Sequence, residues 1–191
     1  MVGHSFGGKV ALKYRENNIS TVRLTWTLDS APAPINPSLF DSENRSESVV
    51  RLKEVLRTLP PWKTKAELAQ AISDKGFSPI VSQWMTTNVV SKPDKTVGFI
   101  FDLDMVDALF DDYCHQDMFP TLTKKQLDSQ VHFLRAGRNR SMWTADVLGK
   151  FETLVDQDTV HLHTMSNAGH FVHAQSPEAV HQLMEPSFQS V

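Results

Sequence analysis

The sequence predicts an α/β fold in which a mostly parallel β-sheet is flanked by helices and interrupted by a helical insertion. Three observations predict it: strand and helix patterns alternate at both ends of the chain, amphipathic helices fill its middle, and the composition is globular. The 191 residues are 40% hydrophobic and 21% charged, which is enough for one domain with a core. Alternating strands and helices are typical of parallel strands joined by right-handed crossovers.

Residues 1–32 are expected to contribute a helix and a strand to the sheet. Apolar residues at helical spacing predict the helix over 7–14. Alternating β-branched residues predict a strand over 22–28, which ends at Asp29 before a cluster of prolines. An acidic residue therefore closes a strand of the predicted sheet.

Residues 33–120 are expected to form a helical cap, or lid, inserted into the sheet domain. Apolar periodicity, with breaks at Pro and Gly residues, predicts helices over 46–59, 64–75, 79–89 and 103–113, with a short strand over 97–101.

Residues 121–191 are expected to complete the core of the sheet domain. Their patterns predict strands over 131–136 and 159–165, and helices over 143–154 and 177–184.

The motif GHSFGG at residues 3–8 matches the G-x-S-x-G pattern, in which a serine sits on a sharp strand-to-helix turn. Ser5 is the candidate nucleophile, and the glycines two positions to either side, Gly3 and Gly7, are expected to avoid a collision across the turn. The helix that follows begins at the site, so the backbone N–H of Phe6 can bind a developing oxyanion. The motif is short, and it also occurs by chance in turns that only cap a helix.

A second motif, NAGHFVH at residues 167–173, lies between the last predicted strand and the last predicted helix. His170 is the candidate base, because α/β hydrolases present their catalytic residues in the chain order serine, acid, histidine. His4 and His173 are expected to support His170 from nearby. His161 and His163 alternate on one strand, a spacing compatible with metal ligands, but no carboxylate or cysteine lies close in sequence, so strand packing is the preferred interpretation.

The acid has two candidates. Many proteins of this fold carry it shortly after the strand predicted over 131–136, but the segment GRNR at 137–140 places cations there. Asp29 closes a neighbouring strand at the same edge of the sheet and is the preferred acid, expected to orient His170. Asp146 is the alternative acid, and its other interpretation is a helix-capping role.

Four segments carry a resemblance to a known family: GHSFGGK at 3–9, LDSAP at 28–32, FLRAGRN at 133–139 and NAGHFVHAQSP at 167–177. Together they resemble the abhydrolase-domain esterases of the α/β-hydrolase superfamily, which group bacterial short-chain acyl esterases with abhydrolase-domain protein eleven of animals. The resemblance spans nearly the whole chain. It implies Asp29 as the acid, a helical cap, and ester or thioester substrates with acyl chains.

Members of that family carry about half a fold before the serine turn, including the first strands and the loop that supplies a second oxyanion N–H. The sequence is therefore expected to be a partial α/β-hydrolase fold, the C-terminal portion, with the N-terminal strands missing.

The expected function is that of a serine hydrolase that cleaves carboxylic ester or thioester bonds through Ser5, His170, Asp29 and an acyl-enzyme. Acyl transfer or C–C bond hydrolysis by the same residues stays open. An alternative from another class is a truncated, catalytically impaired fragment or isoform that is inactive or acts as an interaction protein. An incomplete sheet also favours self-association through its edge.

Composition limits the partners and cofactors. The net charge of −3 is spread over 19 basic and 22 acidic residues, so nucleic acid is not an expected partner. No apolar run is long enough to predict a membrane span, and no metal or organic cofactor is expected. Cys114 is the single cysteine and is expected to be buried and inert, which favours a reducing compartment such as the cytoplasm or mitochondrion. The physiological substrate and the localisation are not determined by the sequence.

Overall fold

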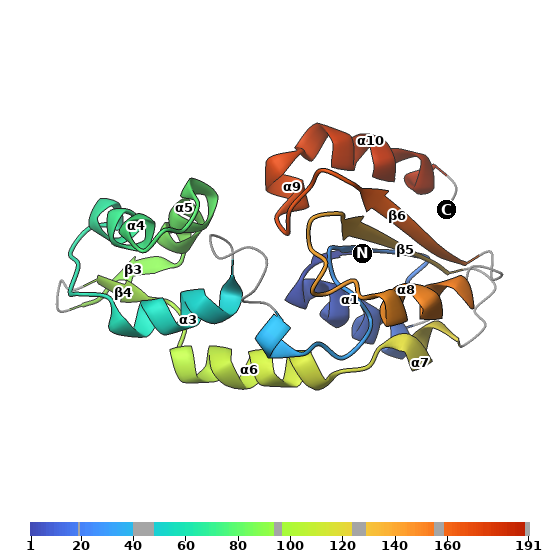
Figure 1. The fold of residues 1–191 in the computed structure, drawn as a ribbon, viewed down its shortest axis with the longest axis horizontal. Helices are drawn as coiled ribbons and strands as arrows, with labels where there is room; N and C mark the ends of the chain where they lie inside the picture. Colours follow the sequence, from blue (N-terminus) through green and yellow to red (C-terminus); the bar gives the residue numbers. More distant parts are fainter. Residues whose placement is uncertain (19, 40–47, 94–96, 124–128, 155–158, 190–191) are drawn as a thin grey trace. The chain divides into compact units, whose positions relative to one another are not determined.

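The structure, a computed structural model, describes residues 1–18, 20–39, 48–93, 97–123, 129–154 and 159–189. The chain divides into two compact units (Figure 1). The first unit comprises Met1–Ile35 and Tyr113–Val191, and the second comprises Asn36–Asp112. The first is built on a parallel sheet and the second is mainly helical, which confirms the predicted fold class.

Four parallel strands form the sheet of the first unit, in the spatial order β1-β2-β5-β6. Their bounds are Val2–His4 for β1, Leu24–Leu28 for β2, Gln130–Ala136 for β5 and Val160–Met165 for β6. The strands predicted over 22–28, 131–136 and 159–165 are confirmed to within a residue or two. Because the strands are parallel, their carboxyl ends meet at one edge of the sheet.

Helices cover both faces of this sheet (Figure 1). One face carries α1 (Phe6–Asn17), α7 (Phe119–Leu122) and α8 (Ala145–Glu152), and the other carries α9 (Val172–Gln175) and α10 (Pro177–Phe188). The two short helices α7 and α9 have no counterpart in the predicted elements, and α10 extends four residues beyond the predicted end at residue 184. Pro186 lies inside α10, in the final turn; it removes the N–H that would donate four residues back, and only two helical residues follow it.

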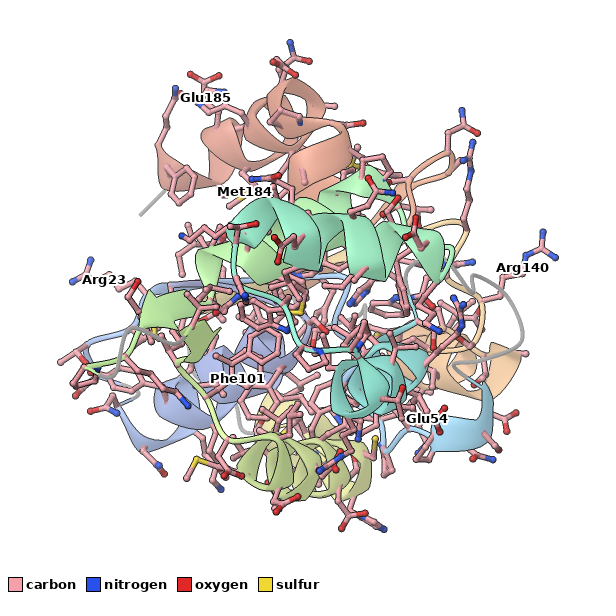
Figure 2. The ribbon with its side chains drawn as sticks, turned by 90° about the vertical axis from the view of Figure 1, so that its left-hand side faces the viewer. Arg23, Glu54, Phe101, Arg140, Met184 and Glu185 are labelled. Atoms are coloured by element: carbon pink, nitrogen blue, oxygen red, sulfur yellow. The ribbon has the colours of Figure 1, made fainter. Side chains whose placement is uncertain are left out.

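Neighbouring residues of β5 pack into different cores. The Phe133 ring contacts the Phe151 ring of α8, with centroids 4.9 Å apart, whereas Leu134 joins Trp26 in a cluster with α9 and α10. Figure 2 labels two adjacent residues of α10: Met184, which belongs to this cluster, and Glu185, which is exposed. Full burial of each large apolar side chain contributes about 1.5–3 kcal/mol, so the sheet is held from both faces.

The second unit contains the helices α3 (Val49–Thr58), α4 (Lys65–Asp74) and α5 (Pro79–Thr87), most of α6 (Leu103–His115), the short helix η1 (Pro37–Leu39), and a hairpin of β3 (Val89–Ser91) and β4 (Val97–Phe99). Ser48, Thr64 and Ser78 cap the N-termini of α3, α4 and α5, each accepting a hydrogen bond from a backbone N–H of the first turn. These caps place the helix starts. The assignment of residues 33–120 to a lid stays a prediction.

The helix predicted over 79–89 is wrong at its C-terminal end. Asn88 ends α5, and Val89 starts β3, which pairs with β4 in antiparallel register, Val89 opposite Phe99. β-Branched residues gain more from such cross-strand packing than from a last helical turn.

Cys114 is buried, with 2% of its surface exposed, as predicted. Among the described residues, no helix is long and apolar enough to cross a membrane.

Three histidines stack beside Trp26 on neighbouring strands. The His132 ring lies 4.5 Å from the Trp26 ring and 4.3 Å from the His161 ring. Its Nδ1 lies 3.0 Å from Nε2 of His163. His161 and His163 therefore contribute to packing across the sheet, in line with the strand-packing interpretation.

Acid is expected to destabilise the first unit through His132. Burial, and then the neighbouring His161 and His163, lower the pKa of His132 from 6.5 to about 4. The unfolded chain therefore takes up a proton before the folded chain does, so stability falls as the pH drops from about 6.5 toward about 4. Over that pH range, we expect His132 to lower the free energy of unfolding by on the order of 2 kcal/mol, after allowance for solvent screening.

Urea unfolding between about pH 7 and about pH 4.5 measures this loss. A His132→Leu variant should show a shallower decline with falling pH than the wild type, and a control variant at the exposed His181, His181→Leu, should not. Equal slopes for the wild type and His132→Leu would contradict the prediction.

Candidate active site

Ser5 lies in the sharp turn between β1 and α1. Its backbone has φ of 52° and ψ of −118°, one of two positive φ values among the described non-glycine residues. The Ser5 N–H donates to the Leu28 carbonyl at 3.0 Å, and the Ser5 carbonyl accepts from the Gly8 N–H at 2.9 Å. Such a conformation costs free energy and persists only where the surroundings enforce it, and here the turn places Ser5 at the carboxyl edge of the sheet.

The glycines around Ser5 differ in how much room they have. A Cβ on Gly3 would lie 2.0 Å from the Gly7 carbonyl oxygen, and one on Gly8 would lie 2.4 Å from Cβ of Ser30. A Cβ on Gly7 would meet no atom within 4 Å. The expected collision across the turn is therefore confirmed for Gly3 and wrong for Gly7, because Gly7 is itself the backbone that a Gly3 side chain would strike.

Replacing Gly3 by alanine is expected to lower the free energy of unfolding by about 3 kcal/mol or more, since a backbone atom cannot move aside as a flexible side chain can. Gly7→Ala is the matched control. It adds the same methyl group into open space within α1, and we expect it to be neutral or to stabilise by about 0.5 kcal/mol. Chemical denaturation of both variants measures the difference, and equal stabilities would contradict the close packing of the turn.

His170 lies in the loop between β6 and α9, and its ring joins Ser5 to Asp29. Nε2 of His170 is 3.0 Å from Oγ of Ser5, and Nδ1 is 2.8 Å from Oδ2 of Asp29. Because the carboxylate only accepts, Nδ1–H donates to Asp29 and leaves Nε2 free to accept the Ser5 hydroxyl proton. The structure thus brings together three residues that are far apart in the chain.

Asp29 follows β2 and is fully buried, with φ of 45°. Each of its carboxylate oxygens accepts two hydrogen bonds. Oδ1 accepts from the Ala136 backbone N–H at 2.9 Å and from Nε1–H of Trp143 at 2.8 Å. Oδ2 accepts from Asn139 at 2.6 Å and from His170 at 2.8 Å. The four donors fix the orientation of the carboxylate and hence that of the imidazole.

Asp146, the alternative acid, is exposed and lies in the first turn of α8. Asp29, by contrast, contacts the His170 ring directly. The helix-capping interpretation of Asp146 is wrong, because Thr144 caps α8 by accepting from the Val147 N–H; Asp146 lies in the first turn, where the helix dipole favours a negative charge.

Sequence reasoning missed Asn139 and Trp143. Both follow β5, on the loop where many proteins of this fold carry their acid, and both donate to Asp29. The signal was present: an amide stands in the GRNR segment where a carboxylate was sought.

His4 and His173 both lie close to His170. Nε2–H of His4 donates to the His170 backbone carbonyl at 2.8 Å, and the ring centroids of His4 and His173 are 4.5 Å apart. Burial, and then the neighbouring charge of His170, lower the pKa of His4 from 6.5 to about 4. His4 is therefore neutral at pH 7, and it holds the backbone of His170 without competing for the proton.

Phe6 is the first residue of α1 and directly follows Ser5. The N–H groups of the first helical turn have no carbonyl partner within their own helix, and the helix dipole makes them good donors to an anion. The Phe6 N–H therefore lies where an oxyanion donor is expected.

No protein-family model matches the sequence, and a search of curated proteins found no match. Solved structures do resemble it. A marine microorganism esterase superposes with a TM-score of 0.73 at 19% identity, over 97% of this chain and 68% of its own. A peroxisomal alpha-beta-hydrolase of Saccharomyces cerevisiae has a TM-score of 0.63 at 14% identity, over 99% of this chain and 52% of its own. A thioesterase domain from the curacin biosynthetic pathway has a TM-score of 0.60 at 13% identity, over 96% of this chain and 63% of its own.

These likenesses show that the chain has the α/β-hydrolase fold. The chain spans between about half and about two thirds of the length of the three structures, which agrees with the partial fold that the sequence predicts. The resemblance to the abhydrolase-domain esterases stays a prediction.

Proposed function

We propose that this chain carries the reactive centre of a serine hydrolase acting on carboxylic esters or thioesters. Ser5 is the nucleophile, His170 the general base and Asp29 the acid that orients it. One observation carries the proposal: the two contacts of the His170 ring, 3.0 Å to Oγ of Ser5 and 2.8 Å to the Asp29 carboxylate, are the contacts that base-assisted attack by a serine requires.

In the proposed reaction, Oγ of Ser5 forms a bond to the carbonyl carbon of the substrate while its proton passes to Nε2 of His170. The carbonyl π electrons move onto oxygen, and the oxyanion accepts a hydrogen bond from the Phe6 N–H. The carbon–oxygen or carbon–sulfur bond then breaks, and the leaving alcohol or thiol takes the proton from His170. A water molecule, deprotonated by His170, cleaves the acyl-enzyme and restores the Ser5 hydroxyl.

The ester or thioester class has support from the similar structures. One is named an esterase and another a thioesterase domain, and both classes of reaction pass through an acyl-enzyme when a serine attacks.

A second candidate function is that of an impaired hydrolase that associates with another chain, and the exposed edge of the sheet favours it. β1 lies at one end of the strand order, and Val2, Val10 and Tyr14 of β1 and α1 are each about half exposed, at 51%, 50% and 50%. An edge strand beside exposed apolar side chains favours pairing with further chain.

Two measurements on the purified 191-residue chain separate the candidates. Turnover of a short p-nitrophenyl ester and covalent labelling by a fluorophosphonate, with the adduct mapped to Ser5 by mass spectrometry, would support the hydrolase. A chain that elutes as an oligomer in size-exclusion chromatography and neither turns over ester nor takes up the label would support the second candidate.

A further inference from the structure

His170 lies in the loop between β6 and α9, outside both regular elements. Its ring nevertheless keeps two contacts at once, 3.0 Å to Oγ of Ser5 and 2.8 Å to Oδ2 of Asp29. A misplacement of about 1 Å in a catalytic group can cost on the order of 100-fold in rate, and loops are in general more mobile than the elements that they join. The position of the ring therefore depends on what holds the backbone of this loop.

Two side chains bind the backbone around His170. The Gly169 N–H donates to Oε1 of Gln175 at 2.8 Å, and the His170 carbonyl accepts from Nε2–H of His4 at 2.8 Å. One bond lies before the Cα of His170 in the chain and the other lies after it. Together they restrict the backbone dihedral angles from which the imidazole projects.

Both side chains come from the ends of regular elements. His4 is the last residue of β1 and directly precedes Ser5, so its bond ties the loop of the base to the turn of the nucleophile. Gln175 is the last residue of α9, a short helix that the fully buried Val172 anchors in the core. A site held by packed elements is more precise than one held by loops alone.

Burial makes these two hydrogen bonds hard to replace. Gly169 is buried, so its N–H has little access to water when the Gln175 acceptor is lost, and a buried donor without a partner is costly. The preceding residue, Ala168, is also buried, and its carbonyl accepts from the Arg138 backbone N–H at 3.1 Å. That backbone bond survives a change of side chain, so the bonds made by Gln175 and His4 can be removed one at a time.

We propose that Gln175 is a positioning residue of the hydrolytic reaction and that, with His4, it clamps the backbone on either side of His170. This inference rests on the proposed function, because the clamp acts only through the ring that serves Ser5 as base. Neither side chain takes part in the proton transfer. The clamp orients the imidazole before substrate arrives, and such orientation lowers the entropic part of the barrier.

Gln175 is tested by Gln175→Met, which removes the acceptor and keeps a side chain of similar length. Gln175 is exposed, so the variant is expected to fold. We expect kcat for a short p-nitrophenyl ester to fall by about 3-fold to 10-fold, the factor that one net hydrogen bond corresponds to, with KM nearly unchanged. Gln175→Glu keeps an acceptor oxygen and should restore most of the rate. Gln182→Met, the same change at an exposed residue of α10, is the control and should match the wild type.

His4 is tested in the same way. His4→Leu removes the donor to the His170 carbonyl and should lower kcat by a similar factor. His4→Gln keeps an N–H donor near the position of Nε2 and should restore most of the rate. His181→Leu, at an exposed histidine of α10, is the control. If His4→Leu does not fold, the Gln175 variants alone decide.

Proton NMR of the full chain gives a readout that does not depend on turnover. The Nδ1–H of His170 donates to Asp29, and a proton held against a carboxylate resonates downfield of the backbone amides. Its absence from His170→Gln identifies it. We expect faster exchange with water to broaden this resonance in Gln175→Met and His4→Leu, and the wild-type line width in Gln175→Glu and His4→Gln. A substitution that only lowered overall stability would leave the line width of the folded chain unchanged.

The outcomes separate the inference from the function on which it rests. A wild-type chain that turns over ester, together with a Gln175→Met chain of wild-type rate and line width, would overturn the inference and leave the proposed function intact. A loss that Gln175→Glu shares in full would also overturn it, because the acceptor oxygen would then not be responsible. A wild-type chain with neither turnover nor labelling would overturn the proposed function, and the line widths would still decide whether Gln175 and His4 hold the ring.

Discussion

Replacing Ser5 by alanine is expected to abolish ester turnover, lowering kcat by about 10⁴-fold or more, the scale seen when a serine nucleophile is removed from such a triad. The variant keeps His170 and Asp29 but offers no oxygen 3.0 Å from the imidazole to attack the carbonyl. Binding and oxyanion stabilisation remain, so a small residual rate above that of water is expected. Steady-state kinetics with a short p-nitrophenyl ester measure the loss, and fluorophosphonate labelling should disappear with it.

Ser166→Ala is the matched control for this change. Ser166 follows β6 and is exposed, so its replacement removes a hydroxyl without touching the turn at Ser5. It should retain full turnover and labelling. A Ser5→Ala chain with wild-type turnover would remove Ser5 from the mechanism and, with it, the proposed function.

Replacing Asp29 by asparagine is expected to lower kcat by about 10⁴-fold, because the amide no longer holds the tautomer in which Nδ1 of His170 donates and Nε2 accepts. The substitution also turns one acceptor into an NH₂ group within a ring of four donors. Two of the four groups that donate to Asp29 would then face the NH₂ group and lose their acceptor, which should lower the free energy of unfolding by about 1–3 kcal/mol. Urea unfolding and single-turnover kinetics separate the two effects.

Asp146→Asn is the paired variant, since Asp146 is the alternative acid. It lies exposed in the first turn of α8, where losing a negative charge costs about 0.3–1 kcal/mol of stability. Turnover is expected to stay at the wild-type level. The reverse pattern, with Asp29→Asn active and Asp146→Asn inactive, would transfer the acid role to Asp146.

The sequence was sufficient for the residues whose roles are visible from local pattern and chain order. Ser5 stands in a glycine-rich turn, Asp29 closes a strand and His170 follows the last strand, and the structure places the His170 ring within hydrogen-bonding distance of both Ser5 and Asp29. Parallel strands carry their carboxyl ends to one edge, so finding the strands was enough to predict that these residues meet.

The residues around them could not be found in this way. Asn139 and Trp143 contact Asp29 across more than a hundred residues of chain. The amide of Asn139 is visible in the GRNR segment, but only the fold shows that it donates to a carboxylate that follows another strand.

Local sequence patterns and tertiary packing therefore determined different features of this protein. By itself, the sequence determined the α/β class, the strands at 22–28, 131–136 and 159–165, and the candidates Ser5, Asp29 and His170, because hydrophobic period and turn chemistry are local properties of the chain. Only the tertiary structure decided that Asp29 rather than Asp146 contacts His170, that Gly3 and Gly8 but not Gly7 are crowded, and that Asn139 and Trp143 donate to Asp29. Those outcomes depend on distances between buried groups, which are set by how whole helices and strands pack.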